Sequence, residues 1–357
     1  MDKIKVLVVG AGNMGRSHAL AYQAIPEFEV AGVCTRTPES RAGLMAELAP
    51  ATPEFDDYAR ALEVLQPDAV CISTYPDTHY RFVKMALEAN CHVFTEKPLA
   101  ETVNECQELV DLARQKGKAL AVGYILRQHP SWVKFVEVAK TLGKPLVMRM
   151  NLNQQSYGKD WGTHKSLLSS ISPVVDCGVH YVDVMCQMTG AKPVRVSGTG
   201  ARLTDELPEG KINYGQLQVT FEDGSVGWYE AGWGPMMSET AFFIKDVVGP
   251  LGSASIVAAE AGSRGKSSSV EAHTQTERIL VHRSKVGENG ELEPVDEYID
   301  LDDEPDHDEL CRREQLFFRD AILGQVDITE HQDSAVRASE ILLAADRSSR
   351  DGAMIQL

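Results

Sequence analysis

The sequence lacks the features that would tie it to a membrane or to nucleic acid. It contains no run of 18 apolar residues, the length that a membrane-spanning helix requires. It also lacks an excess of positive charge, since 35 Lys and Arg stand against 52 Asp and Glu, a formal net charge of −17. Such a surface repels phosphate backbones and anionic lipid, so neither nucleic acid nor a membrane is an expected partner. Met1-Asp2-Lys3 leads directly into an apolar strand, and no signal peptide is expected.

A cysteine pattern typical of a metal centre or of a disulfide framework is absent too. The seven cysteines are odd in number, scattered, and include no C-x-x-C pair. They stand at positions 34, 71, 91, 106, 177, 186 and 311. We therefore predict buried free thiols, no bound metal, and a reducing, cytoplasmic location.

The length and the order of elements predict two domains. A chain of 357 residues with 43% hydrophobic residues is long enough for two cores. Apolar strands alternate with helices up to about residue 124, which predicts an open, doubly wound parallel sheet with helices on both faces, a Rossmann fold. After that point strands follow one another with alternating faces, which predicts an α+β domain with a mostly antiparallel sheet. The expected boundaries are 1–124 for dinucleotide binding and 125–357 for substrate binding and oligomerisation.

A glycine fingerprint follows the first strand. The apolar run Lys5–Val9 meets Gly10-x-Gly12-x-x-Gly15, and a helical pattern begins at once. The first glycine permits the tight turn, the second lets the backbone approach a pyrophosphate, and the third lets helix and strand pack closely. The helix amides, starting at Asn13 and Met14, then face the phosphates. This context favours a dinucleotide site over an ordinary glycine-rich turn.

The end of the second strand bears on the choice of cofactor. About 20 residues beyond the fingerprint, an NAD site usually carries an acidic residue for the ribose 2′-hydroxyl. Thr35 and Arg36 stand there instead, and a hydroxyl with a guanidinium suits a 2′-phosphate. We therefore predict NADP as the cofactor, with NAD also possible. The alternative is an exposed arginine that stacks on adenine without phosphate selectivity.

Further polar residues fall at the carboxyl ends of the predicted parallel strands, where ligands bind in such sheets. Thr74 opens the segment Thr74-Tyr75-Pro76-Asp77-Thr78-His79, and Glu96-Lys97-Pro98 follows the strand at 91–95. The predicted cofactor contacts from these segments are Thr74, Pro76, His79, Glu96 and Lys97. In the second domain, strands are expected at 146–152, 194–201, 215–221, 227–231 and 240–245, and a helix at 173–189. Residues 260–269 are expected to form a loop, and the acidic run 302–309 a solvated surface.

Together, four motifs resemble one known family. They are the glycine fingerprint, the segment 74–79, Thr95-Glu96-Lys97-Pro98 with Gly123-Tyr124, and Asp176-x-x-x-His180. The chain resembles, over almost its whole length, the glucose-fructose oxidoreductase / inositol dehydrogenase / rhizopine catabolism (Gfo/Idh/MocA) family. The resemblance implies that Glu-Lys-Pro lies beside the nicotinamide with a cis Lys97–Pro98 bond. The family's glycine-rich stretch ahead of the Asp-x-x-x-His is replaced here by Ser169-Ser170-Ile171-Ser172-Pro173.

Oxidation of a secondary alcohol needs hydride transfer and removal of the hydroxyl proton. Asp176 and His180 are four residues apart and therefore share one helix face. We predict that His180 is the general base, that Asp176 supports it, and that Lys97 donates to the alcohol oxygen. The residues are equally compatible with Lys97 carrying the proton. The non-catalytic alternative is that Asp176 is an acid near the helix N-terminus and that His180 is a histidine packed in the protein interior.

The predicted substrate is a sugar, cyclitol or related polyol, with contacts from Lys97, Arg127, Tyr157, Trp161 and His180. Arg127 is a cation that follows the final parallel strand. Tyr157 and Trp161 lie in the polar, aromatic segment 154–164, and an ordinary surface loop can have the same composition. Two other functions fit the same residues: an NAD-dependent glycosidase that uses transient oxidation, and a non-catalytic nucleotide sensor. The apolar side chains Leu217, Val219 and Phe221 share a strand face, and we predict that they pack on another subunit in a homodimer or homotetramer.

Overall fold

The computed structural model describes residues 2–239, 243–258, 266–269, 274, 276–301 and 304–357. It divides the chain into two compact units. Unit 1 comprises residues 1–125 and 305–339, and unit 2 comprises residues 126–304 and 340–357. The break after Ile125 lies next to the predicted boundary, but residues 305–339, which the sequence placed in the second domain, lie in unit 1.

Unit 1 is built on a parallel six-stranded sheet with the strand order β3-β2-β1-β4-β5-β6. Its strands are β1 (Ile4–Val9), β2 (Phe28–Cys34), β3 (Glu54–Phe55), β4 (Ala69–Ile72), β5 (His92–Thr95) and β6 (Leu120–Val122). The helices are α1 (Asn13–Ala24), α2 (Pro38–Met45), α3 (Tyr58–Leu65), α4 (His79–Glu88), α5 (Val103–Lys116), α10 (His307–Ile322) and residues 329–339 of α11 (Thr329–Asp351), with the short 3₁₀ turn η1 (Pro76–Thr78). A second 3₁₀ turn, η2 (Ile125–Gln128), begins at the last residue of the first segment of unit 1. This order confirms the predicted Rossmann fold.

Local sequence signals set several of these helix ends. Thr102 accepts from the backbone N–H of Glu105, and the Glu105 side chain accepts from the N–H of Thr102, so a capping box opens α5. Gly117 closes the same helix in the left-handed conformation. Asn90, two residues beyond the end of α4, also adopts the left-handed conformation, with a φ of +65°.

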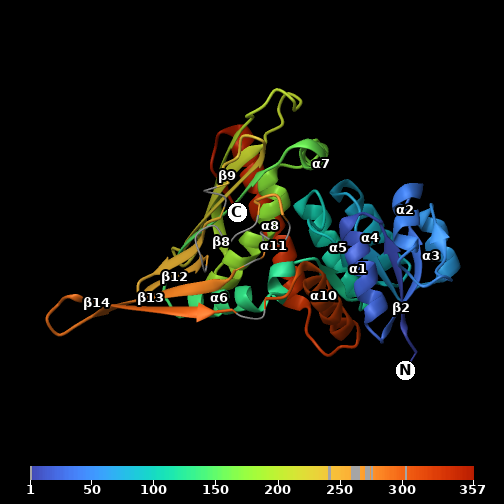
Figure 1. Ribbon diagram of the computed structural model, residues 1–357, viewed down its shortest axis with the longest axis horizontal. Helices are drawn as coiled ribbons and strands as arrows, with labels where there is room; N and C mark the ends of the chain where they lie inside the picture. Colours follow the sequence, from blue (N-terminus) through green and yellow to red (C-terminus); the bar gives the residue numbers. More distant parts are fainter. Residues whose placement is uncertain (1, 240–242, 259–265, 270–273, 275, 302–303) are drawn as a thin grey trace. The chain divides into compact units, whose positions relative to one another are not determined.

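Helix α10 returns late in the sequence to the core of unit 1. It lies beside α1, although the two are nearly 300 residues apart in sequence (Figure 1). Phe318 is fully buried among side chains of α1 and β2 that include Tyr22 and Phe28. Because this apolar face of α10 packs against the core of unit 1, the helix belongs to unit 1 and not to the second domain, where the sequence analysis placed it. Asp306 accepts from the Glu309 amide and caps α10.

Unit 2 is built on a nine-stranded sheet with the order β14-β13-β12-β11-β7-β10-β9-β8-β15. The strands are β7 (Val147–Gln155), β8 (Pro193–Ala201), β9 (Tyr214–Phe221), β10 (Val226–Gly234), β11 (Lys245–Gly249), β12 (Gly252–Val257), β13 (Arg278–Val286), β14 (Leu292–Asp300) and β15 (Ile355–Gln356). All neighbours are antiparallel except the parallel pair β7 and β10, which confirms a mostly antiparallel sheet. The β13–β14 hairpin extends beyond the rest of the sheet (Figure 1).

Helices cover one face of this sheet. Unit 2 contains α6 (Pro130–Lys140), α7 (Gly158–Leu168), α8 (Pro173–Thr189) and residues 340–351 of α11 (Thr329–Asp351). Leu217, Val219 and Phe221 of β9 are at most 1% exposed and face the side on which α8 packs. The prediction that these three side chains meet another subunit is therefore wrong, because the chain's own helix covers them.

Other sequence predictions were corrected by the structure. Residues 158–168 form α7, where the sequence suggested only a polar segment, and β12 to β14 were not predicted. The acidic run is not a plain solvated surface, since Glu304 accepts from the amides of Thr276 and Glu277. The predicted strand 240–245 and loop 260–269 fall largely outside the described residues. In the described parts of the chain, no helix has both the length and the apolar character needed to cross a membrane.

Candidate active site

The glycine fingerprint forms the turn between β1 and α1. Gly10 has a φ of +100°, and a Cβ there would lie 2.3 Å from the Ser73 carbonyl oxygen. A Cβ on Gly15 would lie 2.0 Å from the Gly10 carbonyl oxygen, so both positions require glycine. A Cβ on Gly12, by contrast, would meet no atom within 4 Å. Gly12 is also the N-cap of α1, and as a glycine it has no side chain that could occupy the helix amides. Open space thus faces the helix N-terminus, an arrangement that fits a bound pyrophosphate.

The residues expected to select the ribose follow β2 at the same sheet edge. Thr35 is half-buried, and its amide donates to the Phe55 carbonyl at 3.0 Å. Arg36 is exposed. Arg41 donates to the Thr35 carbonyl at 2.8 Å and pairs with Glu54 at 3.0 Å, so its guanidinium holds the loop. The guanidinium of Arg41 is therefore occupied within the loop, whereas the side chain of Arg36 is exposed.

His79 connects two loops at the carboxyl edge of the sheet. Its side chain is fully buried, with Nδ1 2.7 Å from the Pro98 carbonyl and Nε2 3.0 Å from the Thr74 carbonyl. Burial lowers the pKa of this imidazole. Pro76 is also buried, whereas Thr74 is half-buried and shares a 2.7 Å hydroxyl contact with Thr78. His79 therefore holds the loops around Thr74 and Pro98 in place.

Lys97 follows β5 at the same edge. The Lys97–Pro98 peptide bond is cis, as the family resemblance implies. Lys97 is half-buried, and its amide donates to Glu96 Oε2 at 3.3 Å. The carboxylate of Glu96 also contacts His18 Nε2 at 2.8 Å. Glu96 is therefore held inside unit 1, whereas Lys97 is only partly buried.

Asp176 and His180 lie one turn apart on α8 in unit 2. Ser172 caps this helix by accepting from the Val175 amide, and Pro173 occupies its first turn. Thirteen of its 17 residues are buried. Asp176 and His180 are both half-buried. A helix this apolar belongs in a core, so two ionisable side chains at adjacent, partly open positions call for a reason beyond packing.

The segment before α8 contributes both buried and open side chains. His164 Nδ1 lies 2.8 Å from Ser156 Oγ, and its ring stacks on Trp233 with centroids 4.4 Å apart. Burial lowers the pKa of His164, while the nearby charge of Asp176 opposes that shift. Tyr157 is 60% exposed, but Trp161 is only 5% exposed. Tyr157 is thus available to a ligand, whereas Trp161 belongs to the core.

Arg127 is committed to a partner within unit 2. It donates from Nε and Nη2 to the two carboxylate oxygens of Asp183, at 2.8 and 2.6 Å. Gln187 donates to the same carboxylate at 2.9 Å. This ion pair weakens the prediction that Arg127 contacts substrate, because its guanidinium is already bonded to the buried carboxylate of Asp183.

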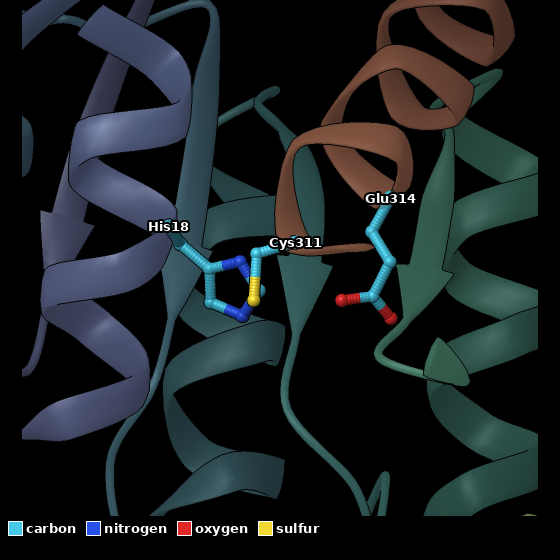
Figure 2. Close-up of side chains that lie close together, drawn as sticks. All are labelled: His18, Cys311 and Glu314. Atoms are coloured by element: carbon cyan, nitrogen blue, oxygen red, sulfur yellow. The ribbon is translucent and has the colours of Figure 1, made fainter. Parts of the chain in front are cut away.

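Three potential metal ligands come together in unit 1. The donor atoms of His18, Cys311 and Glu314 lie within 4.8 Å of one another, with His18 on α1 and the other two on α10 (Figure 2). Both ring nitrogens of His18 already have partners, Glu96 at 2.8 Å and Gln315 at 2.9 Å. A metal would have to break one of these contacts, so we assign none. All seven cysteines are buried and free, as predicted.

Comparison with known proteins decides the family. Residues 4–124 match the model of an oxidoreductase family with an NAD-binding Rossmann fold, GFO_IDH_MocA, and residues 136–244 match a GFO/IDH/MocA C-terminal domain. The chain belongs to this oxidoreductase family. The two Gfo/Idh/MocA matches cover the glycine fingerprint, the Glu-Lys-Pro segment and α8, the elements on which the resemblance was based.

The names of curated relatives are those of sugar and inositol dehydrogenases. UDP-N-acetylglucosamine 3-dehydrogenase of Acidithiobacillus ferrooxidans is 31% identical over 228 residues, 63% of this chain and 66% of that protein. D-glucoside 3-dehydrogenase of Escherichia coli is 30% identical over 54% of this chain and 56% of that protein. The alignments span less than two thirds of the length of both relatives.

Solved structures support the Gfo/Idh/MocA fold over the full length. Scyllo-inositol dehydrogenase from Lactobacillus casei, with NAD(H) and scyllo-inositol, has a TM-score of 0.75 at 18% identity and 99% coverage of both chains. GenD2 from gentamicin A biosynthesis, in complex with NAD, has a TM-score of 0.74 at 20% identity, covering 100% of this chain and 97% of that one. At these identities the likeness establishes the fold alone.

Sequence reasoning missed one group of site residues. Gln315 and Glu314 on α10 lie beside His18 and the Glu96 carboxylate, far from the fingerprint in sequence. No local motif marks them. Their only signal was that two helical polar residues interrupt an apolar stripe near the C-terminus.

Proposed function

We propose that the chain is an NAD(P)-dependent oxidoreductase that interconverts a secondary alcohol and a ketone on a sugar, cyclitol or related polyol. The observation that carries the proposal is that Asp176 and His180 are both half-buried, one turn apart on the largely buried α8. A protein that only senses a nucleotide has no need for an acid–base pair at this place. The named relatives, dehydrogenases of glycosides and nucleotide sugars, support the same substrate class.

The dinucleotide site is supported by the geometry of unit 1. The amides at Asn13, Met14 and Gly15 open α1 and would hold the pyrophosphate. Thr35 and Arg36 would meet the ribose end, and we infer from Arg36 a preference for NADP over NAD. When bound, the nicotinamide supplies the site for hydride transfer. Thr74 and Lys97 would contact the cofactor directly, while Pro76, His79 and Glu96, all buried, shape the loops around it.

Each catalytic side chain has one task in this proposal. His180 accepts the hydroxyl proton during oxidation, since an imidazole titrates near neutrality. The carboxylate of Asp176, one turn earlier, favours the protonated ring. The ammonium of Lys97 donates to the reacting oxygen and stabilises the alkoxide character that develops there. Tyr157, exposed just before α7, is proposed to contact substrate, whereas buried Trp161 and ion-paired Arg127 are proposed to support unit 2 from inside.

A substrate screen tests the proposed function. Purified protein is mixed with NADP or NAD and a panel of sugars, glycosides and inositols, and reduced nicotinamide is followed by absorbance. We expect turnover with at least one polyol, and none in a Lys97→Met variant that still binds the dinucleotide. Release of an aglycone without net nicotinamide reduction would instead identify a glycosidase. Dinucleotide binding with no reaction on any member of the panel, in either direction, would favour a sensor.

A further inference from the structure

His18 occupies the centre of a buried polar cluster in unit 1. Its side chain is fully buried on α1, behind the glycine fingerprint. Nε2 lies 2.8 Å from Glu96 Oε1 at the end of β5. Nδ1 lies 2.9 Å from Gln315 Nε2 on α10. The ring also meets Phe94 edge-on, with centroids 4.7 Å apart. The contacts of both ring nitrogens and the contact with Phe94 hold the imidazole in this orientation.

The partners of His18 determine where its proton lies. A side-chain amide nitrogen can only donate, so Nδ1 accepts from Gln315. The ring proton is therefore on Nε2 and is donated to Glu96. This is the arrangement in which one hydrogen bond of a histidine selects the tautomer and the other serves a carboxylate.

Glu96 transmits this contact to the backbone at Lys97. Its Oε1 accepts from His18, and its Oε2 accepts from the Lys97 amide at 3.3 Å. A Cβ on Gly123 would lie 3.2 Å from Oε1, so glycine at that position leaves room for the carboxylate. A chain of contacts thus runs from α10 through α1 to the residue that bears the proposed catalytic ammonium.

Ionisable groups from several elements surround Glu96. They are His18 on α1, Cys71 on β4, His79 on α4, and His307, Cys311 and Glu314 on α10. Glu314 is 3% exposed, and its Oε1 has no hydrogen-bond partner in the described structure. Burial, together with the charge of Glu96, raises the pKa of Glu314 well above its usual range. Glu96, by contrast, is the carboxylate of the cluster that contacts His18 Nε2 and accepts from the Lys97 amide.

We propose that His18 is a positioning residue for the reaction: it holds the Glu96 carboxylate against the Lys97 backbone, in a tautomer selected by Gln315. The proposal rests on the role assigned to Lys97 above. His18 touches neither substrate nor reacting atoms in this account. It acts by fixing the loop from which Lys97 reaches the hydroxyl.

Three variants separate positioning from plain stability. His18→Leu removes the donor to Glu96. His18→Gln keeps an amide N–H near the place of Nε2 and should rescue the contact. His92→Leu is the matched control: His92 begins the same strand, accepts from the Ala119 amide at 3.0 Å, and has its pKa lowered to about 4 by burial. It should cost stability without reaching Lys97.

The readouts are kcat and the hydrogen exchange rate of the Lys97 amide. A displacement of about 1 Å at a reacting group can cost about 10²-fold in rate, and we expect a loss of that order in His18→Leu. The Lys97 amide should exchange faster in that variant. In His18→Gln most of the rate and the slow exchange should return, and His92→Leu should match the wild type in both.

The outcomes also separate this proposal from the proposed function. If His18→Leu loses only thermal stability, with the wild-type kcat and Lys97 exchange, the positioning role is wrong. If Lys97→Met keeps full turnover, the assigned role of Lys97 fails instead. In that case the exchange comparison still decides whether His18 holds this backbone, because it does not depend on turnover.

Discussion

At the scale of single residues, the proposed preference for NADP depends on Arg36. It is exposed beyond β2, where Arg41 is already occupied by the Thr35 carbonyl and Glu54. Arg36→Ala should weaken NADP binding by about 1–3 kcal/mol, the value of a lost charged hydrogen bond, and leave NAD binding nearly unchanged. Calorimetric titration of both cofactors measures this.

A control for that experiment is Arg60→Ala, which removes another exposed cation from unit 1, one that pairs with Glu63 on α3. It should affect neither cofactor. Equal losses for NADP and NAD in Arg36→Ala would show that the arginine stacks on the adenine or acts as a general charge, with no role in phosphate selection.

A second residue-scale prediction concerns the buried acid Glu314. Its raised pKa means that the folded state binds a proton that the unfolded chain releases above pH about 4.3. Unit 1 should therefore lose stability as the pH rises from that value toward the folded pKa, by up to about 1.4 kcal/mol per pH unit for this one proton. Glu314→Gln removes the proton and keeps the shape, so it should flatten this slope and exceed wild-type stability at neutral pH.

Urea unfolding across pH 5 to about 8 measures the slope. Glu309→Gln is the comparison on the same helix, because Arg312 and Arg313 lower the pKa of Glu309 and its removal should not flatten the profile. An unchanged slope in Glu314→Gln would mean that Glu314 is ionised in the folded protein.

At the scale of elements, α8 combines an apolar body with a polar stripe that includes Asp176, His180 and Asp183. Asp183 is 2% exposed and receives both donors of the Arg127 fork. Arg127→Met leaves that carboxylate buried without its cation, which should cost about 3–5 kcal/mol of unfolding free energy. Arg312→Met on α10 breaks a fork-like pair at the surface and should cost less than about 1 kcal/mol.

Kinetics of the folded Arg127→Met protein distinguish support from recognition. We expect a KM close to that of the wild type, because the guanidinium serves Asp183. A KM raised tenfold or more with little loss of stability would restore Arg127 as a direct substrate contact.

How far the sequence predicted these elements follows from where their signals lie. Helix α8 was predicted at 173–189 and is observed there, because Ser172, Pro173 and Gly190 mark its ends locally. Helix α7 was missed because Gly158, Gly162 and scattered polar residues hide its single buried face. Strands β13 and β14 are rich in charge, and pairing with neighbouring strands defines them. The cluster around His18 needs α10, whose place in unit 1 rests on contacts that no local pattern reveals.

At the scale of the whole molecule, the face of the unit 2 sheet opposite to α8 is the candidate surface for contact with a second copy of the chain. Leu217, Val219 and Phe221 are covered by the chain's own helix. On the opposite face, Val147 is 47% and Val248 41% exposed, near Trp228. We propose that this face joins subunits in a homodimer or homotetramer. Light scattering should give a multiple of 39.2 kDa, and Val147→Lys should shift it toward 39.2 kDa. A wild-type monomer at micromolar concentration would contradict this assembly.

The central claim is that His180 performs proton transfer while unit 1 binds the dinucleotide. Its most direct test is the kcat of His180→Ala on the best polyol from the screen, with the dissociation constant of the dinucleotide measured on the same protein. We predict a fall in kcat of about 10²–10⁴-fold, the typical contribution of a positioned acid–base group, with dinucleotide affinity unchanged. Near-normal turnover of the folded variant would remove His180 from the mechanism and leave α8 as a structural helix.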